Sequence, residues 1–202
     1  MSANQHDKTK SIWKRTKKKN KNNKKQSKGE RLCTPKICSS TKDKIKKTFK
    51  NISKNGLSTI EITNILNNLP NFLGVYPQDY LNSLTILSYP VCFVVNLDES
   101  YLKGSHWVAI SIFDKSIEIY DSLGFNVDLW PNYPIHFIKF LSLYSHSHDF
   151  VITPRLQPDN SHLCGLYCIY FLIFRNIFTY QKCLSFFKSD IENDKILLKL
   201  LC

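Results

Sequence analysis

The stretch HWVAISIFDKSIEIYD, residues 106–121, consists of two β-rich runs separated by the dipeptide Asp114-Lys115. Runs of Val, Ile and aromatic residues on either side of two turn residues are typical of a β-hairpin. If residues 113 and 116 pair across the turn, Ile112 faces Ile117 and Ile110 faces Ile119. The stretch therefore predicts a hairpin within a buried sheet.

The same register brings a histidine and an acidic residue together. It places Val108 opposite Asp121 and His106 opposite Leu123. Because side chains alternate between the two faces of a strand, all four lie on one face. His106 and Asp121 are then diagonal neighbours, about 7–8 Å apart at the backbone. Their side chains can meet.

A second informative stretch is QPDNSHLCG, residues 157–165, which precedes a long apolar segment. Asn160 or Ser161 is a natural N-cap, so we expect Cys164 in the first turn of a buried helix. The positive end of the helix dipole favours a thiolate there. Gly165 would let another backbone approach closely.

These residues can fill the roles of a nucleophilic site. Cys164 would be the nucleophile, His106 its base and Asp121 the group that orients the imidazole. The side-chain amide of Gln157 and the backbone N–H of Cys164 could donate to an oxyanion. Taken singly, each residue also has a structural interpretation, and Cys168 and Cys183 are interpreted as core residues. The joint arrangement favours catalysis.

The remaining pattern predicts helices around this sheet. A helix begins near Leu57 and ends at Pro70, and a loop follows over residues 72–77. The other expected elements are strands at 91–95 and 150–153 and helices at 133–144, 163–179 and 181–201. We expect an α+β fold: a central mixed sheet with a hairpin carrying His and Asp, flanked by helices, and the catalytic Cys at the N-terminus of a buried helix.

The net charge of +12 is concentrated at one end of the chain. Residues 1–50 carry 18 basic and three acidic side chains, whereas the rest carries ten basic and 13 acidic ones. Such a Lys-rich segment predicts a disordered tail over residues 1–50, followed by one domain over 51–202. Its densest part could bind phosphate backbones of nucleic acid or be merely solvated; the basic residues there are Lys14, Arg15, Lys17, Lys18 and Lys19.

The seven cysteines are odd in number and scattered, as suits a reducing compartment. A secretory signal peptide is not expected, because no apolar stretch follows the first lysines. The longest apolar run, Leu166 to Phe174, is too short to span a bilayer. We therefore expect an intracellular protein without a membrane partner and without a metal site.

Three motifs carry a resemblance to a known family: His106-Trp107, YDSLGF at 120–125 and QPDNSHLCGLYC at 157–168. In this order they resemble the adenovirus protease (adenain) family and its relatives in Maverick/Polinton elements and virophages. The upstream FLGVY at 72–76 is also similar, so the resemblance covers about residues 57–180. Ubiquitin-like-protein proteases are more distantly similar, with the same order of His, acid, Gln and Cys.

The resemblance implies a thiol protease with His106, Asp121 and Cys164 as triad and Gln157 in the oxyanion hole. It also implies that Trp107 packs near the imidazole. Family members cleave virion precursor proteins, often after small residues such as Gly. They need no cofactor but are stimulated by DNA, a contact that the basic tail could supply. The implied location is the host cytoplasm or nucleus, or the virion itself.

Two departures from the adenoviral pattern matter. The acid is Asp121 where the adenoviral enzymes usually have Glu, but relatives share this change. Residues 136–156 contain no cysteine, so activation by a disulfide-linked peptide is not expected. Two alternatives stay open: a deconjugating protease for a ubiquitin-like modifier, and a nucleic-acid-binding structural protein that uses the basic tail.

Overall fold

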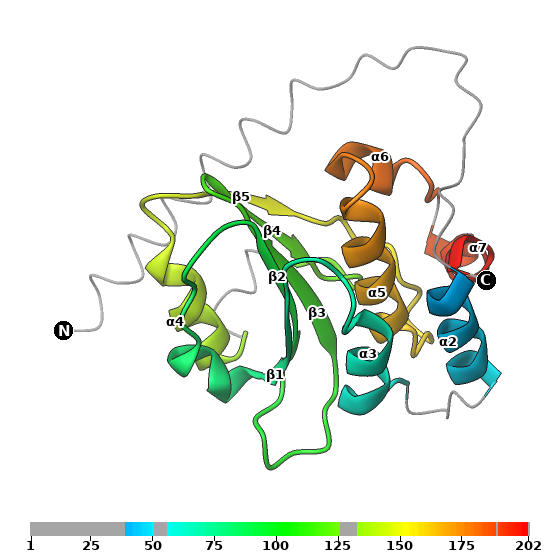
Figure 1. Ribbon diagram of the computed structural model, residues 1–202, viewed down its shortest axis with the longest axis horizontal. Coiled ribbons are helices and arrows are strands. Elements are labelled where there is room, and N and C mark those ends of the chain that lie inside the picture. Colours follow the sequence, from blue (N-terminus) through cyan, green and yellow to red (C-terminus); the bar gives the residue numbers. More distant parts are fainter. Residues whose placement is uncertain (1–38, 51–55, 126–132, 189, 202) are drawn as a thin grey trace.

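A five-stranded mixed sheet lies at the centre of the protein, with helices on both faces (Figure 1). The computed structural model describes residues 39–50, 56–125, 133–188 and 190–201. In spatial order the strands are β1 (Phe72–Pro77), β2 (Val91–Asn96), β3 (Trp107–Ile112), β4 (Ser116–Tyr120) and β5 (Asp149–Ile152). The helices are α2 (Ser39–Lys50), α3 (Thr59–Leu66), the 3-10 helix η1 (Gln78–Ser83), α4 (Ile135–Leu143), α5 (Cys164–Arg175), α6 (Tyr180–Leu184) and α7 (Asp190–Leu201). The predicted α+β class is confirmed.

The β3–β4 hairpin has the predicted register. Ile110 pairs with Ile119 and Ile112 with Ile117 in an antiparallel ladder. β2 is also antiparallel to β3, whereas the outer pairs, β1 with β2 and β4 with β5, are parallel. β3 is therefore the central strand, buried along its whole length.

Side-chain alternation along the strands divides the interior into two cores. On one face, Phe93, Ile110 and Ile119 pack with Phe137 and other side chains of α4 and η1. On the other face, Val94, Ala109 and Tyr120 pack under α5, and α3, α6 and α7 contribute to the same core. α5 is buried on nearly every side, as its sequence predicts. A helix so enclosed gives its first residue a fixed position.

The far end of α5 is anchored by an ion pair. Arg175, the last residue of the helix, donates from Nε and Nη2 to the two carboxylate oxygens of Glu118 on β4, at 2.7 and 3.0 Å. Tyr120 donates to the same carboxylate. Bidentate pairing fixes orientation as well as distance. The axis of α5 is thereby tied to the hairpin that carries the candidate base and acid.

The structure describes part of the segment that was expected to be a disordered tail. Residues 39–50, which the sequence pattern assigns to a disordered tail, form α2 beside α3 (Figure 1). Ile45 lies in the main core with 1% of its surface exposed, and Lys44 Nζ donates to the carbonyl oxygen of Asn64 at 2.8 Å. Ile45 is the one buried residue among the described side chains of α2, and the lysines around it masked the helical pattern. Residues 1–38 lie outside the described residues.

Two further elements differ from the prediction. The segment 72–77 was expected as a loop, but it is the edge strand β1; Gly74 and the register irregularity between Phe72 and Val75 explain why no alternation was visible. The expected helix 181–201 is split into α6 and α7, because Phe186 and Phe187 turn into the core between them. Neither difference moves the candidate site.

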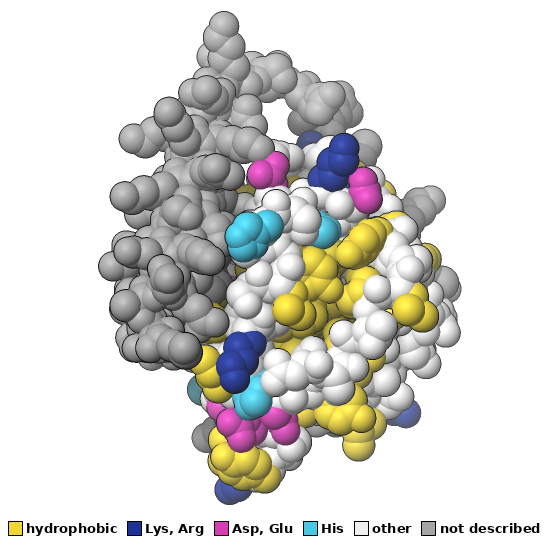
Figure 2. Space-filling view, turned by 90° about the vertical axis from the view of Figure 1, so that its left-hand side faces the viewer, with side chains coloured by type: hydrophobic (Ala, Val, Ile, Leu, Met, Phe, Trp, Pro, Cys, Tyr) yellow, Lys and Arg dark blue, Asp and Glu magenta, His cyan; other side chains and the backbone are white. Residues whose placement is uncertain are grey.

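Figure 2 shows the side of the molecule that carries α4, where hydrophobic side chains reach the surface beside histidines. Exposed large apolar residues on η1, on the segment after it and on α4 are Tyr80, Leu87, Tyr89, Ile135 and Leu143. Within the described part of the chain, no helix is long and apolar enough to cross a membrane.

Candidate active site

His106 and Asp121 meet at one end of the hairpin. Each lies one residue beyond its strand, His106 before β3 and Asp121 after β4. His106 Nε2 is 2.8 Å from Asp121 Oδ1, and the acid is 2% exposed. The backbone N–H of Leu123 donates to the same oxygen at 3.0 Å. The pairing predicted from the register is therefore present in the structure.

Cys164 is the first residue of α5. The predicted caps, Asn160 and Ser161, are wrong: Leu163 is the N-cap residue and has no side-chain cap bond. The hydroxyl of Ser161 instead accepts from the Leu163 N–H, which holds the preceding residues in a loop. Cys164 consequently stands at the helix start itself, where backbone N–H groups lack helical partners and the dipole favours negative charge.

The imidazole of His106 lies next to both Asp121 and Cys164. Its Nε2 hydrogen-bonds the Asp121 carboxylate, and Cys164 is near enough to affect the pKa of the ring. Burial disfavours the charged ring, but the hydrogen bond to Asp121, the charge of that carboxylate and the neighbouring Cys164 prevail. Together they raise the pKa of His106 to about 9. At neutral pH the ring is protonated beside the sulfur.

Other described cysteines have a different environment. Burial raises the pKa of Cys92 and of Cys183 to about 12, and it raises the pKa of Cys168 well above its usual value. These three are buried thiols in the hydrophobic interior. Cys164 differs from them in position, because it is the first residue of α5 and borders the cleft described below.

Gln157 is held at both ends of its amide. Its Oε1 accepts from the Ser122 hydroxyl at 2.6 Å, and its Nε2 donates to the carbonyl oxygen of Ser161 at 2.7 Å. These bonds fix which end of the amide is the donor, and they leave a second N–H on Nε2. Ser122 was not predicted from the sequence as part of the site. It directly follows Asp121 at the end of β4, so its side chain points to the opposite side of the chain.

Trp107 and Gly165 support the wall next to Cys164. The indole Nε1 donates to the carbonyl oxygen of Leu57 at 2.9 Å. A Cβ at Gly165 would lie 3.1 Å from the Leu57 Cβ. The missing side chain at Gly165 therefore lets the side chain of Leu57 come close, whereas the sequence had predicted a close approach by another backbone segment. Both residues therefore hold the segment before α3 against the site. Packing of Trp107 near the imidazole stays a prediction.

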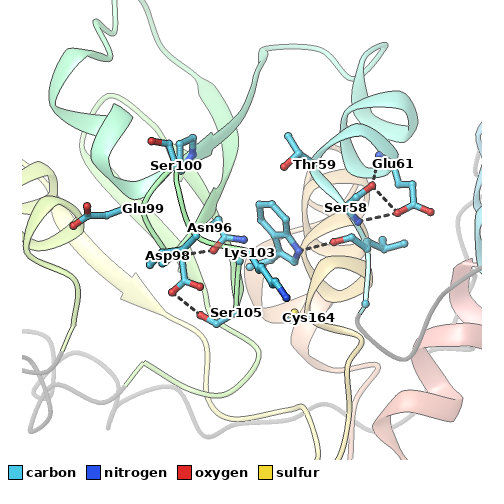
Figure 3. A pocket seen from close by; sticks show the side chains of 16 residues that line it. Ser58, Thr59, Glu61, Asn96, Asp98, Glu99, Ser100, Lys103, Ser105 and Cys164 are labelled. Carbon is cyan, nitrogen blue, oxygen red and sulfur yellow. Dashed lines mark hydrogen bonds between the residues drawn. The ribbon is translucent and has the colours of Figure 1, made fainter.

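A cleft of about 480 Å³ opens over Cys164 (Figure 3). One wall consists of the residues just before α3 together with the first turn of that helix. The other wall is the loop from β2 to β3. The lining residues are Gly56, Leu57, Ser58, Thr59, Glu61, Pro77, Asn96, Asp98, Glu99, Ser100, Leu102, Lys103, Gly104, Ser105, Trp107 and Cys164. A ligand pocket of this size admits a peptide segment with the sulfur at its edge.

Both walls of the cleft are stiffened locally. Ser58 and Glu61 form a capping box at the start of α3. In the other wall, Asp98 accepts from the Ser105 hydroxyl at 2.9 Å, and Asp79 accepts from the Ser100 hydroxyl at 2.8 Å. The side chain of Ser100 and its backbone N–H hold the pKa of Asp79 below its usual value. No local sequence pattern predicts this cleft, because loops build it.

The predicted nucleic-acid-binding residues Lys14, Arg15, Lys17, Lys18 and Lys19 lie outside the described residues. Among the residues that the structure does describe, no group of three or more His, Cys, Asp or Glu is placed to hold a metal ion.

The structure thus brings His106 next to both Asp121 and Cys164. No protein-family model and no curated protein matches the chain. A similar solved structure is described as "SUMO protease Ulp1 with the catalytic cysteine oxidized to a sulfinic acid". It is 17% identical, the match covers 84% of this chain and 99% of that one, and the TM-score is 0.39. Conclusions about this site therefore rest on its own geometry.

Proposed function

We propose that the protein is a cysteine endopeptidase with Cys164 as nucleophile, His106 as general acid and base, and Asp121 as the orienting acid. The observation that carries the proposal is the imidazole of His106, which is hydrogen-bonded to Asp121 and lies beside Cys164 at the start of α5. The cleft over the sulfur supplies the place for a substrate chain. This combination fits acyl transfer through a thioester.

In the first half of the reaction the Cys164 thiolate attacks the carbonyl carbon of the scissile peptide bond. The carbonyl oxygen becomes an oxyanion, which the free N–H of Gln157 Nε2 and the backbone N–H of Cys164 stabilise. The C–N bond then breaks as the imidazolium of His106 gives its proton to the leaving amine. A thioester on Cys164 and a neutral His106 result.

In the second half, water attacks the thioester carbonyl. Neutral His106 takes a proton from that water, and the sulfur leaves as a thiolate. The product is the new carboxyl end of the substrate, and the thiolate–imidazolium pair is restored. Asp121 keeps the ring in the orientation that serves both proton transfers.

For the substrate we propose virion precursor proteins of a virus or mobile element, cut after small residues. This part of the proposal is supported by the resemblance of the motifs at 106–107, 120–125 and 157–168 to the adenovirus protease family. The role of DNA as an activator, bound through the basic tail, is a further part of it. Hydrolysis should proceed without that contact, because every proposed catalytic group lies in the described body.

The test is active-site labelling of the purified protein. A Gly-Gly peptide ending in an electrophile should modify Cys164 and leave Cys92, Cys168 and Cys183 unmodified, because burial keeps those three protonated. Peptide mapping by mass spectrometry identifies the labelled cysteine. A fluorogenic Gly-Gly peptide should be hydrolysed by the same preparation.

The controls separate the alternatives. A ubiquitin-like modifier ending in the same electrophile should label no faster than the peptide; labelling by the modifier alone would make the protein a deconjugating protease. Modification spread over several cysteines, with no hydrolysis of either substrate, would contradict an enzymatic site. Deletion of residues 1–38 should leave hydrolysis intact. The alternative of a structural nucleic-acid-binding protein predicts no hydrolysis before or after the deletion.

The pH dependence of hydrolysis follows from His106. Its pKa is raised to about 9, so the imidazolium that protonates the leaving amine is present at neutral pH and is lost as pH rises through about 9. We expect kcat/KM for the fluorogenic peptide to decline above about pH 9 rather than above the ordinary histidine value near 6.5. A decline that already sets in at pH 6–7 would show that Asp121 and Cys164 do not hold the proton on the ring.

A further inference from the structure

The Asp121 carboxylate has a third hydrogen-bond donor besides His106 and the Leu123 amide. The hydroxyl of Tyr133 donates to Asp121 Oδ2 at 3.1 Å, whereas the other two donors share Oδ1. Both oxygens of this nearly fully buried acid are therefore engaged. Nothing in the sequence pattern links Tyr133, twelve residues downstream, with the acid.

Packing places the Tyr133 ring independently of that hydrogen bond. The ring lies 4.2 Å from the ring of Phe125, which follows the turn after Asp121, and 6.2 Å from Phe137 on α4. Aromatic contacts at these separations fix a side chain by area and geometry. The contacts with α4 and with the turn therefore place the Tyr133 hydroxyl next to Oδ2. Removing the hydroxyl oxygen of Tyr133 alone would leave its ring in place.

We propose that Tyr133 is a positioning residue of the catalytic site. Its hydroxyl holds Oδ2, so the carboxylate cannot rotate and Oδ1 stays directed at His106. It also takes up part of the negative charge, which limits how tightly the acid holds the imidazolium and leaves the ring free to give its proton to the leaving amine. The inference rests on the proposed roles of His106 and Asp121.

Titratable side chains from the start of β3 and from α5 lie near the carboxylate. His106 faces it from the start of β3, and Cys164 and Cys168 face it from α5. Burial keeps Cys168 neutral, so its charge state does not change over the range in which His106 titrates. The Tyr133 hydroxyl bonds Asp121, so a shift in the titration of His106 on its loss reports on the carboxylate.

The experiment is the substitution Tyr133→Phe, which keeps the ring and deletes the oxygen. We expect kcat for the Gly-Gly peptide to fall about 10-fold, the size of one hydrogen bond to a charged group, with KM unchanged. Proton NMR of the imidazole should show the midpoint of the His106 titration moving upward from about 9, because more negative charge now faces the ring. The matched control is Tyr144→Phe at the other end of α4, which should change neither value.

The titration needs no substrate, so it also tests the inference if the peptide is not cleaved. An upward shift without any hydrolysis would support the role of Tyr133 on Asp121 and count against the protease. Unchanged kcat together with an unchanged or lowered midpoint would overturn the inference. A fall in kcat that follows a fall in thermal stability, without a shift of the midpoint, would assign Tyr133 a structural role and overturn it as well.

Discussion

Replacing Cys164 by alanine is expected to lower kcat for the Gly-Gly peptide by about 10⁶-fold, to the level of hydrolysis without a nucleophile. The substitution removes the sulfur that forms the thioester, and no other described cysteine can take its place. Cys168, one turn further along α5, points into the interior and has a pKa well above the usual value. The measurement is the rate of peptide hydrolysis by matched amounts of folded protein.

Cys168→Ala is the matched control, because it deletes the same atom from the same helix. It should retain activity within a few-fold, while the cavity it leaves lowers the free energy of unfolding by roughly 1 kcal/mol. Cys164→Ala should unfold at a temperature close to that of the wild type, since its side chain faces the cleft. More than a few per cent of wild-type activity in Cys164→Ala would exclude this residue as the nucleophile.

The hairpin was predictable because several constraints agreed on it. A two-residue turn fixed the register, and a shift by one residue would have moved Ile110 and Ile119 to the other face. The contact of His106 with Asp121 follows from that register. The position of Cys164 was predictable for a similar reason, since a helix buried on all sides must begin where the polar residues end.

Other parts of the site depend on chain segments that only tertiary structure brings together. The cleft is made by the loop from β2 to β3 and by the residues before α3, which no local periodicity connects. The anchoring of Gln157 by Ser122 joins two loops 35 residues apart. The caps of α5 were mispredicted because Ser161 has a competing use: its hydroxyl and its carbonyl oxygen bond within the loop. Short polar side chains form hydrogen bonds with backbone groups of loops as readily as with those of helix ends.

Asp121→Asn is expected to lower kcat by up to about 10⁴-fold at neutral pH, with little effect on folding. An asparagine fits the same space, and its carbonyl oxygen can still accept from His106 Nε2 and from the Leu123 N–H. Its amide can then donate to the Tyr133 oxygen, which accepts where it donated before. The substitution thus preserves the shape of the site and removes only the negative charge.

Without that charge the imidazolium loses its main stabilising partner, and burial, which lowers the pKa of His106, prevails. The midpoint of the His106 titration should fall well below 9, and the alkaline limit of hydrolysis should move down with it. Asp114→Asn, the same change in the turn at the far end of the hairpin, should leave both unchanged. The variants Asp121→Asn and Tyr133→Phe must therefore shift the titration of His106 in opposite directions. If Tyr133→Phe also lowers it, the Tyr133 hydroxyl acts by holding the carboxylate in place and not by taking up part of its charge.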